Sequence, residues 1–507
     1  MSKKYYITTP IYYVNDVPHI GHAYTTIAAD VLARFHKTKG EDVFFLTGTD
    51  EHGAKIAEAA SKAGKEPKDF VDELAPKFQE TWKKLNIEYS EFFRTTNPEH
   101  EKLVQEFMQK VKDNGYIEKR SYSGLYCISC ERYYKPEELI DGKLCPDHKR
   151  DCVEQTEENY FFLLSKFGDQ LIKKIENGEF EIGPESRKNE IISKIKLGLE
   201  DVSVSRANVK WGIPFPGDQE QTIYVWFDAL LNYWTAGKIY FPQMDDGRPN
   251  NEQQTEQSQN TKYEIRNTSL WPADLHLMAK DILWFHAVIW PAMLIAAGEE
   301  APKKVFAHGF FTINGQKMSK TLGNVIDPND VVDKFGADAV RYALLREFPF
   351  GEDGDISLER IRKRYDEELS NTLGNLLQRT LVMIKKYCAQ EFSNYQFPSA
   401  SWRINQSSIT QFQKQVSSEI NNLQFSRALE KVMEFTGSLN QLINEKAPWV
   451  LAKEGKDEEA AAVLSQVFAG IVEIAESLVP FMPETAGKMK KQLETLEPEP
   501  LFPRLES

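Results

Sequence analysis

Residues 4–46 read KYYITTPIYYVNDVPHIGHAYTTIAADVLARFHKTKGEDVFFL, and this stretch indicates the fold of the first half of the chain. Residues 4–9 predict a buried strand, and a loop rich in Pro, Asn and Asp follows. A helical pattern covers residues 20–39, a second strand is predicted at 43–46, and helical sequence resumes at residue 51. Strands that alternate with helices are typical of a parallel sheet. We therefore expect a Rossmann-like α/β domain.

Later segments first continue this pattern and then leave it. Strands of the same character are predicted at 222–226, 274–278 and 304–307. From residue 359 onward the apolar residues recur with helical spacing, which predicts an all-α C-terminal domain. The polar, Gln/Asn-rich residues 243–262 predict an exposed loop. The predicted division is 1–115 and 220–325 for the halves of the α/β domain, 116–219 for an insertion, 326–358 for a linker and 359–507 for the helical domain.

Charge and composition exclude several classes of protein. The 507 residues include 62 Lys and Arg against 76 Asp and Glu, a formal net charge of −14. Such an acidic chain is a poor candidate for non-specific binding to nucleic acid. No run of 18 apolar residues occurs, so we expect no membrane span. The N-terminal residues have neither an apolar signal core nor an Arg-rich transit pattern, so we expect a cytoplasmic protein.

Four of the five cysteines lie within 26 residues. Cys127 and Cys130 form one C-x2-C pair, and Cys145 and His148 form a C-x2-H pair fourteen residues later. This spacing is typical of a tetrahedral zinc site, and four protein ligands leave no open position for catalysis. The insertion is therefore predicted to hold one structural Zn²⁺, and Cys152 lies outside the spacing. The alternative is a set of buried, reduced thiols.

The first motif that could take part in binding or catalysis is HIGH, residues 19–22, between the predicted first strand and the predicted first long helix. A helix N-terminus presents unpaired N–H groups and the positive end of the helix dipole, which suits phosphate. Gly21 has no side chain, so an adenine ring could lie against the backbone. His19 and His22 are three residues apart and could both donate to phosphate oxygens. The alternative is a helix start with two solvent-facing histidines.

The second motif is KMSKT, residues 317–321, with Gly315 and Gly323 on either side. Two lysines and two hydroxyl groups on a glycine-hinged loop suit a mobile clamp for a triphosphate. Lysine acts there as a compact point charge against developing phosphate charge. The alternative is a solvated basic loop.

The two motifs, in this order and about 300 residues apart, are similar to the signature of class I aminoacyl-tRNA synthetases. Further segments narrow the family, and the chain resembles the methionyl-tRNA synthetases from end to end. The matching stretches are ITTPIYYVNDVPHIGHAYTTIAADVLAR, GTDEHG, VSR…WGIPFPGD, YVWFDAL, WPADLHLMAKDI, FHAVIWPAML, KMSKTLGNVIDP and NEKAPW. The resemblance is closest to the short bacterial type with a single zinc knuckle.

This resemblance implies an ATP-dependent ligase. It implies activation of L-methionine to methionyl-adenylate and transfer of the methionyl group to the 3′ end of tRNA(Met). Mg²⁺ is expected with ATP, and the family's Zn²⁺ is structural. Residues 326–358 are expected to contact the tRNA stem, and residues 359–507 to bind the anticodon. We expect a monomer, because the dimerising module of some relatives does not follow Ser507.

The resemblance also implies the site residues. For ATP they are His19, Gly21, His22, Lys280, Asp281, Lys317 and Lys320, of which His19, His22, Lys317 and Lys320 are implied to be catalytic. For methionine they are Ile11, Tyr13, Asp50, Trp226, Ala229, Leu230, Tyr233, Phe285, His286 and Trp290. Asp50 is implied to hold the substrate ammonium group, and the aromatic wall suits a thioether. For the anticodon they are Asn375, Arg379 and Trp449, which would stack on bases and bond to base edges.

Three positions depart from the family pattern. Thr321 stands where the signature usually has Ser, and it keeps the hydroxyl group. Ala279 stands where Gly is common before Lys280, and its methyl group could crowd the nucleotide. Leu230 stands where some relatives have Pro, which changes the shape of one wall slightly.

Three rival functions remain to be weighed. A synthetase for leucine, isoleucine or valine carries a large editing insertion, for which the insertion of about 100 residues has no room; a synthetase for cysteine is a further relative. A non-catalytic tRNA-binding protein would not need intact HIGH and KMSKT motifs. A nucleotidyl transferase that no longer binds tRNA would not need the helical domain with Trp449.

Overall fold

The computed structural model describes residues 3–128, 132–146, 149–207, 209–240, 270–313, 315–318, 325–388, 392 and 406–505. The predicted loop at 243–262 and the residues Cys130, His148, Lys320 and Thr321 lie outside this part of the chain. The chain forms two compact units. Unit 1 comprises Met1–Val17, Asp42–Gln79 and Tyr89–Ala307, and unit 2 comprises Pro18–Glu41, Glu80–Glu88 and His308–Ser507. The five predicted domain segments stay a prediction.

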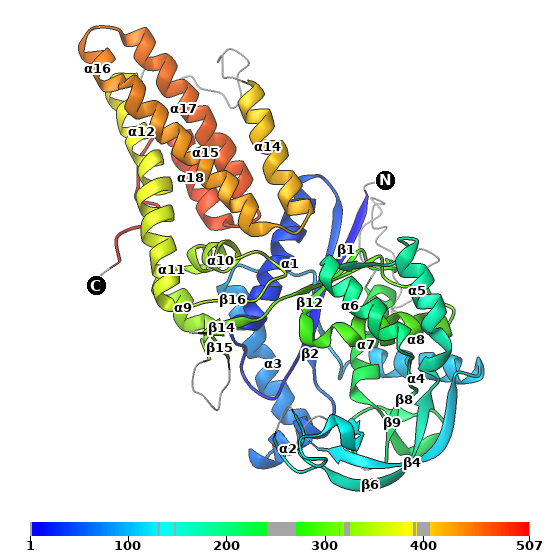
Figure 1. Cartoon of the computed structure of the whole chain (residues 1–507). Helices are drawn as coiled ribbons and strands as arrows, with labels where there is room; N and C mark the ends of the chain where they lie inside the picture. Colours follow the sequence, from blue (N-terminus) through cyan, green and yellow to red (C-terminus); the bar gives the residue numbers. More distant parts are fainter. Residues whose placement is uncertain are drawn as a thin grey trace, which may run out of the picture. The chain divides into compact units, whose positions relative to one another are not determined.

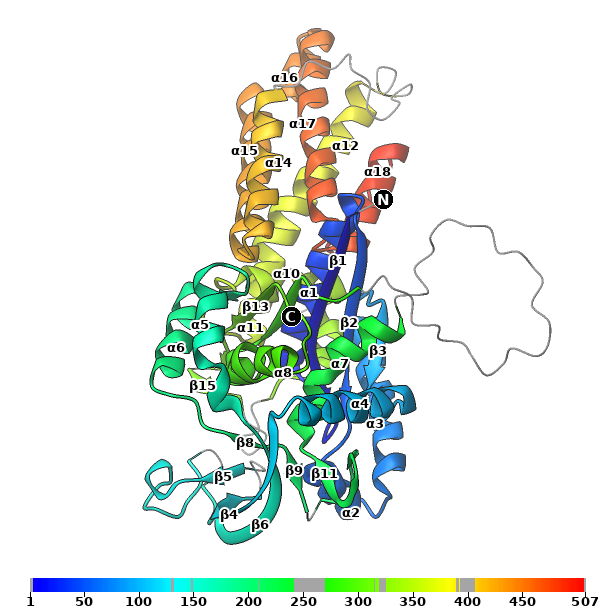
Figure 2. The same ribbon diagram turned by 90° about the vertical axis from the view of Figure 1, so that its right-hand side faces the viewer.

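A six-stranded sheet organises unit 1, with the strand order β3-β2-β1-β12-β13-β7. Its strands are β1 (Lys4–Tyr13), β2 (Asp42–Asp50), β3 (Glu91–Arg94), β7 (Glu181–Gly183), β12 (Leu275–Ala279) and β13 (Lys304–His308). β1 pairs in parallel with β2 and with β12, β2 with β3, and β13 with β7; Figure 2 shows β1 and β2 side by side. The predicted strands at 4–9, 43–46, 274–278 and 304–307 and the parallel α/β fold are confirmed.

The predicted strand at 222–226 is wrong in two respects. β11 (Asp218–Ile223) already ends at Ile223, and helix α7 (Val225–Ile239) begins two residues later. β11 also belongs to a separate antiparallel sheet with β9 (Ser205–Arg206) and β10 (Pro214–Phe215). A short apolar run fits a buried strand and a buried helix equally well, because periodicity cannot separate the two. The helical assignment matters because α7 carries four candidate site residues.

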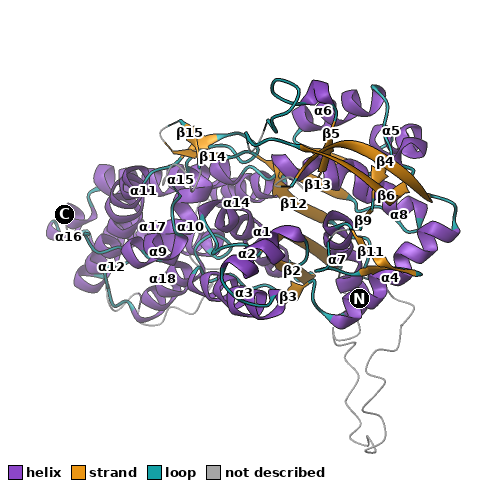
Figure 3. Ribbon diagram, turned by 90° about the horizontal axis from the view of Figure 1, so that it is seen from below, coloured by secondary structure: helices purple, strands orange, loops and turns teal. Residues whose placement is uncertain are grey.

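The predicted insertion at 116–219 folds as mixed structure. Its largest part is an antiparallel sheet of β4 (Ile117–Cys127), β5 (Arg132–Tyr134), β6 (Val153–Phe162) and β8 (Val202–Ser203), in which β4 and β6 form the long ladder seen in Figure 3. Helices α5 (Gly168–Glu176) and α6 (Glu185–Lys196) follow. β7 lies between them in the sequence and forms an edge strand of the central sheet. Three residues are too few for the sequence to predict this pairing.

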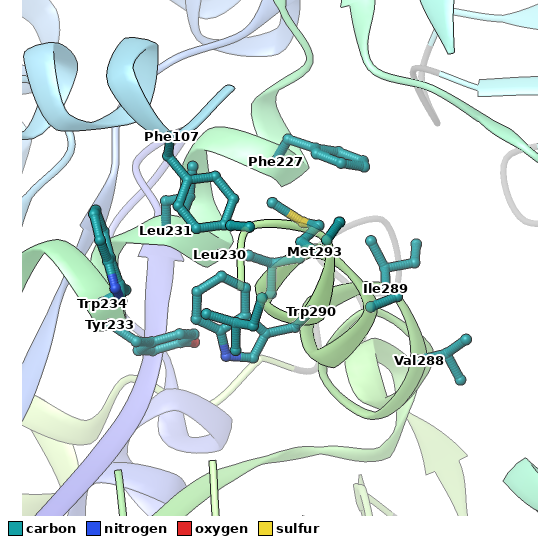
Figure 4. Close-up of a cluster of buried hydrophobic side chains, with 14 of the residues drawn as sticks. Phe107, Phe227, Leu230, Leu231, Tyr233, Trp234, Val288, Ile289, Trp290 and Met293 are labelled. Atoms are coloured by element: carbon teal, nitrogen blue, oxygen red, sulfur yellow. The ribbon is translucent and has the colours of Figure 1, made fainter. Parts of the chain in front are cut away.

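Further helices cover unit 1. They are α2 (Ala54–Lys62), α4 (Pro98–Asp113), α7, the turn η4 (Lys280–Ile282), the π-helical turn η5 (Phe285–Ile289) and α8 (Trp290–Ala296), while α3 (Pro67–Lys84) crosses from unit 1 into unit 2. One large hydrophobic core joins α4, α7 and α8. Figure 4 shows its central side chains, among them Leu230, Tyr233 and Trp290.

Unit 2 contains a small sheet and a helical bundle. The sheet consists of β14 (Phe311–Ile313), β15 (Gln316–Lys317) and β16 (Gly354–Asp355), with helices α1 (Ile20–Thr38), α9 (Pro328–Phe335) and α10 (Ala337–Arg346). The bundle consists of α11 (Leu358–Arg364), η7 (Tyr365–Gly374), α12 (Asn375–Tyr387), α14 (Gln406–Asn421), α15 (Phe425–Lys446), α16 (Pro448–Lys453), α17 (Asp457–Leu478) and α18 (Pro483–Thr495) (Figure 1). The predicted helical C-terminal part is confirmed.

A buried ion pair ties the elements of unit 2 together. Arg341 on α10 lies 2.6 Å from Asp30 on α1, and both side chains are fully buried. The guanidinium group also donates to the backbone carbonyls of Leu85, Pro480 and Phe481. Breaking such a pair by removing one partner is strongly destabilising, because the remaining charge stays buried. Arg341 thus fixes α1, which begins at the HIGH motif, against the base of the bundle.

Helix α17 is the one helix of the described ranges that is long and apolar enough to cross a membrane. Of the stretch that meets this criterion, 56% is buried inside the structure. α17 packs against α12, α15, α16 and α18. Its apolar composition is accounted for by this position within the bundle.

Candidate active site

The first group of predicted methionine-binding residues lies at the carboxyl ends of two parallel strands. Ile11 and Tyr13 end β1, Asp50 is the last residue of β2, and Tyr13 pairs with Asp50 in register. Ligands bind at this edge of a parallel sheet. A Cβ atom at Gly48 would lie 1.9 Å from the carbonyl oxygen of Phe93, so β2 approaches β3 too closely for any side chain there. That close approach positions the end of β2, and with it the buried Asp50.

The second group lies on one face of α7. Trp226, Ala229, Leu230 and Tyr233 follow the spacing i, i+3, i+4, i+7, which places them along a single helical stripe. This spacing is visible in the sequence, but interpreting residue 226 as the end of a strand hid it. The Trp226 ring stacks on the Phe285 ring with centroids 3.9 Å apart and planes 11° apart. The stack joins the second predicted wall to the third.

The third group comprises Phe285 and His286 on η5 and Trp290 at the start of α8. His286 Nδ1 lies 3.0 Å from the carbonyl oxygen of Ile282, which can only accept, so Nδ1 carries the proton. His286 Nε2 therefore accepts from the hydroxyl group of Tyr233, 2.9 Å away. Burial lowers the pKa of His286 to about 4, so the ring is neutral at pH 7. The Tyr233 and Trp290 rings, both labelled in Figure 4, have centroids 6.2 Å apart and planes tilted by 58°.

A second neutral histidine, which the sequence did not single out, supports this wall. Trp290 Nε1 donates to His276 Nε2 at 3.3 Å, which leaves His276 Nδ1 to donate to the hydroxyl group of Thr8 at 2.7 Å. Burial lowers the pKa of His276 well below its usual value. The second and third predicted walls thus come together in unit 1 as aromatic rings with neutral polar partners. Such a surface suits an apolar, polarisable side chain.

The neutral state of His286 predicts a loss of stability in acid. Its folded pKa is about 4, whereas the unfolded chain takes up this proton below about pH 6.5. The free energy of unfolding should therefore fall as the pH drops from about 6.5 to about 4, and His286 should account for about 3 kcal/mol of the loss. We expect His286→Gln to flatten this dependence, as measured by urea unfolding across that range, and to raise the KM for methionine.

His308 offers a matched control in unit 2. Burial also lowers its pKa to about 4, and its ring contacts Thr25 and the carbonyl oxygen of Gly309. His308→Gln should flatten the acid dependence in the same way but leave the KM for methionine unchanged. If His286→Gln leaves the acid dependence of unfolding as steep as in the wild type, a neutral His286 is refuted.

Glu51, next to Asp50, is a second carboxylate that the sequence analysis passed over. It is fully buried, and Arg94 donates to both of its oxygens at 2.6 and 3.0 Å. Thr49 and Thr96 donate to the same carboxylate at 2.7 and 2.5 Å. Because Glu51 accepts hydrogen bonds from three side chains of the protein, we interpret it as a structural residue. The ligand-binding carboxylate of the GTDEHG motif is therefore still assigned to Asp50.

The HIGH motif begins α1 in unit 2, as predicted. His19 is the N-cap residue, and its Nδ1 accepts from the backbone N–H of Gly21 at 3.1 Å. His22 Nδ1 accepts from the backbone N–H of His19 at 3.3 Å, and the two rings stack with centroids 3.6 Å apart. When Nδ1 accepts, the proton of a neutral ring is on Nε2. The predicted phosphate donor of each histidine is therefore its Nε2–H group.

The structure brings part of the second motif to the first. Lys317 ends β15 in a hairpin that turns at Gly315, whose φ of +73° favours glycine. The N–H of Gly315 donates to Asp355 at 2.9 Å. A Cβ atom at Gly21 would lie 3.5 Å from the Met318 methyl carbon. The Met318 side chain of KMSKT thus reaches Gly21 of HIGH, whereas Lys320 and the side chain of Lys317 lie outside the described residues.

Lys280 and Asp281 occupy the turn η4 directly after β12, at the carboxyl end of a central strand of the sheet in unit 1. The Asp281 side chain is exposed there, as a ribose-binding carboxylate requires. Ala279 has φ −77° and ψ 154°, an extended conformation that any residue adopts. The departure from glycine at position 279 therefore imposes no backbone strain.

Two of the predicted zinc ligands lie in the described part of the insertion. Cys127 and Cys145 are buried in one small cluster with Tyr134, Leu139 and Cys152. Burial and the neighbouring Cys127 and Cys145 raise the pKa of Cys152 to about 11, so Cys152 lies beside the predicted ligands rather than apart from them. No group of three metal-binding side chains occurs among the described residues, which exclude Cys130 and His148. Buried sulfur donors brought together in this way fit zinc.

The predicted anticodon-binding residues meet at one end of the bundle. Asn375 and Arg379 lie one turn apart on α12, and Trp449 follows Pro448 at the start of α16. The guanidinium carbon of Arg379 lies 5.8 Å from the Trp449 ring centroid, and Arg379 also donates to Asn444 at 3.0 Å. Trp449 is half-buried, so part of its ring is open to solvent. Its ring and Arg379 form a surface on which a base could stack.

Comparison with known proteins identifies the family. The model of the family described as tRNA synthetases class I (M) matches residues 5–156 and 134–381, well over half of the chain. The chain belongs to this family. A methionine–tRNA ligase of Thermotoga maritima is 44% identical over 99% of this chain and 77% of its own length. A chloroplastic/mitochondrial methionine–tRNA ligase of Arabidopsis thaliana is also 44% identical, over 97% of this chain and 77% of its own length.

A solved structure of a methionyl-tRNA synthetase shares the fold. Mycobacterium tuberculosis methionyl-tRNA synthetase in complex with methionyl-adenylate matches this chain with a TM-score of 0.87. The two sequences are 36% identical, and the match covers 99% of this chain and 100% of the other. The chain thus has the class I synthetase fold.

Proposed function

We propose that the candidate residues of both units carry out the two-step reaction of the family. The chain is an aminoacyl-tRNA ligase that activates L-methionine with ATP to methionyl-adenylate and passes the methionyl group to the 3′ end of tRNA(Met). The observation that supports the residue assignment most directly is the contact of the second and third predicted walls, in which Trp226 stacks on Phe285 and Tyr233 donates to His286. Figure 4 shows Leu230, Tyr233 and Trp290 of these walls in one cluster. Asp50 lies near enough to Tyr233 for its charge to raise the pKa of that hydroxyl group. The order of the two steps follows from the need for an activated carboxyl group.

In unit 1, we assign methionine binding to Asp50 and the aromatic wall. The Asp50 carboxylate would hold the substrate ammonium group by a charge-assisted hydrogen bond. Trp226, Phe285 and Trp290 would surround the thioether, with Tyr233 and the neutral His286 as polar neighbours. A positively charged His286 would lower the selectivity of the pocket for an uncharged side chain. Because the pKa of His286 is about 4, its ring is neutral at pH 7.

In unit 2, we assign phosphate binding to the start of α1 and the KMSKT loop. His19 and His22 would donate through Nε2, and Lys317 and Lys320 would add positive charge as pyrophosphate leaves. Lys280 and Asp281 of unit 1 are assigned to ATP as well, with Asp281 on the ribose. Mg²⁺ would accompany ATP and neutralise part of the phosphate charge. No protein nucleophile is required, since positioning and charge stabilisation suffice.

Substrate screening tests this assignment at the level of the whole enzyme. ATP–pyrophosphate exchange, measured with each of the twenty amino acids, should be fastest with methionine. Discrimination against leucine should be imperfect, because small differences in an apolar pocket are worth only about 1–3 kcal/mol. Faster exchange with leucine or cysteine would contradict the methionine pocket. Exchange without tRNA charging would favour the rival nucleotidyl transferase.

Trp449 should separate charging from activation. Stacking of one base on an aromatic ring is worth about 1–3 kcal/mol by alanine substitution. We therefore expect Trp449→Ala to lower tRNA charging by about 10- to 150-fold while leaving pyrophosphate exchange unchanged. Arg379→Ala should act in the same direction and reduce the salt dependence of tRNA binding if it meets a phosphate.

The conservative variant Trp449→Phe is the matched control. It keeps an aromatic plane at the start of α16 and should retain most of the charging activity. A core role for Trp449 predicts instead a lower melting temperature and an equal loss in both assays. Measuring exchange, charging and melting temperature on the same preparation decides between the two, and equal loss in both assays would remove the anticodon role.

The remaining assignments come from the sequence. We propose one structural Zn²⁺ held by Cys127, Cys130, Cys145 and His148, supported by the burial of Cys127 and Cys145 in one cluster. The metal would hold the loops of the insertion together. We also propose a monomer in the cytoplasm; light scattering should give the mass of one chain, and fractionation should place the protein in the cytoplasm.

A further inference from the structure

A buried chain of three titratable side chains lies beside the methionine-binding candidates and has no role in the assignment so far. Asp228 Oδ2 is 2.6 Å from His52 Nδ1, and Asp228 Oδ1 is 2.7 Å from His100 Nε2. His100 Nδ1 continues to the hydroxyl group of Thr235 at 2.8 Å. We call His52, Asp228 and His100 the His–Asp–His network. Their exposures of 3%, 1% and 0% leave them almost no solvent-accessible surface.

The His–Asp–His network connects the elements that carry the predicted pocket. Asp228 lies on α7 between Trp226 and Ala229, so it shares the helix with the second wall. His52 follows Asp50 by two residues, and its carbonyl oxygen accepts from the Tyr13 hydroxyl group at 3.1 Å. The His52 backbone is therefore bonded to Tyr13 of the first wall, and its ring to Asp228 on the helix that carries the second wall. His100, on α4, holds Asp228 from a third side.

The charged state of the His–Asp–His network makes it costly to move the elements that it connects. Burial alone would raise the pKa of Asp228, but His52 and His100 outweigh it and lower the pKa to about 2. Burial likewise opposes the charge on His52, yet Asp228, Glu101 and Glu51 together raise its pKa. The carboxylate is thus ionised in a dry site where its partners are fixed. Moving α7 relative to the end of β2 would break a buried, charge-assisted contact, which is costly.

We propose that the His–Asp–His network is a positioning device that sets the distance between the Asp50-bearing end of β2 and the aromatic wall on α7, and thereby the affinity for methionine. The proposal rests on the methionine pocket assigned above. A pocket that must hold an ammonium group at one end and a thioether at the other depends on that distance. A misplacement of about 1 Å can cost about 100-fold in an enzyme.

Asp228→Asn tests the proposal, because it removes the charge and keeps the shape. We expect the KM for methionine in pyrophosphate exchange to rise by about 10- to 100-fold, while kcat and the KM for ATP change much less. Equilibrium titration with methionine alone should show the same loss. If Asp228→Asn does not fold, His100→Gln decides the question, since it leaves the His52–Asp228 contact in place and should give a smaller effect in the same direction.

His36→Gln is the matched control. It breaks a histidine–carboxylate contact of similar length, 2.7 Å to Glu41, at the far end of α1 in unit 2. It should lower the melting temperature without raising the KM for methionine. The proposal is overturned if Asp228→Asn lowers the melting temperature but leaves the methionine KM unchanged, or if it raises the KM values for methionine and ATP in parallel.

Asp50→Asn separates failure of this proposal from failure of the pocket assignment. If Asp50→Asn raises the methionine KM and Asp228→Asn does not, the pocket stands and the positioning role is wrong. If neither variant changes it, the pocket itself is misassigned.

Discussion

Replacing His22 by alanine is expected to lower kcat for methionine-dependent ATP–pyrophosphate exchange by about 100- to 1000-fold. The physical reason is the role proposed above for His22 Nε2–H, a donor at a helix N-terminus to the phosphate charge that would develop as pyrophosphate leaves. Loss of one such donor costs about 2.7–4 kcal/mol of transition-state stabilisation. The KM for methionine should change less, because the methionine candidates lie in unit 1. Lys320→Ala is expected to have a comparable effect.

The His22 variant needs a control for helix capping, because His22 also accepts a backbone N–H at the start of α1. Ser357→Ala removes a cap of the same unit, where the Ser357 hydroxyl group accepts from the backbone N–H of Arg360 at 3.2 Å. That loss should cost about 0.5–2 kcal/mol of stability without slowing exchange. Near wild-type exchange by His22→Ala would refute the phosphate role. A slow Ser357→Ala enzyme would show that capping alone explains the loss.

The second large effect is expected from Cys145→Ala, which should release the metal and loosen residues 116–219. Cys145 is fully buried, so its truncation leaves a cavity and, in the proposed site, removes one of the four ligands. Structural zinc is linked to local folding by on the order of 10 kcal/mol. Metal analysis should find one zinc per wild-type chain and much less in the variant. Limited proteolysis should show new cleavage between β4 and β6.

Cys152→Ala is the control for packing, because Cys152 is buried in the same cluster but lies outside the ligand spacing. This variant should lose some stability and keep its zinc. If wild-type protein prepared without chelator contains no zinc, the metal site does not exist. If Cys152→Ala loses as much zinc as Cys145→Ala, the ligand set is different from the one proposed.

Several features of this protein were determined by local sequence. The strands β1, β2, β12 and β13 are buried apolar runs, and such runs predict parallel strands wherever helices alternate with them. The HIGH motif was placed correctly at the start of α1, and Trp449 at the start of α16, because caps and prolines act within one helical turn. These predictions succeeded because the deciding interactions join residues close in sequence.

Other features were decided only by the tertiary structure. The contact between His52 and Asp228 spans 176 residues, and the one between Thr8 and His276 spans 268. No local pattern marks either histidine as the partner of a distant side chain. The tautomer of His286, and with it the direction of the Tyr233 hydrogen bond, likewise depends on the position of the Ile282 carbonyl group.

The same distinction explains the errors. Residues 222–226 are apolar enough for a strand, but Val225 and Trp226 form the first turn of α7, which packs against α4, β1, β2 and η5. The short β7 joins the central sheet by pairing with the edge of β13. A segment of three residues is too short for its sequence to predict such a pairing. Sequence patterns show which residues alternate between buried and exposed positions along a helix or strand. Which distant residues become partners depends instead on which surfaces the folded chain brings within hydrogen-bonding distance.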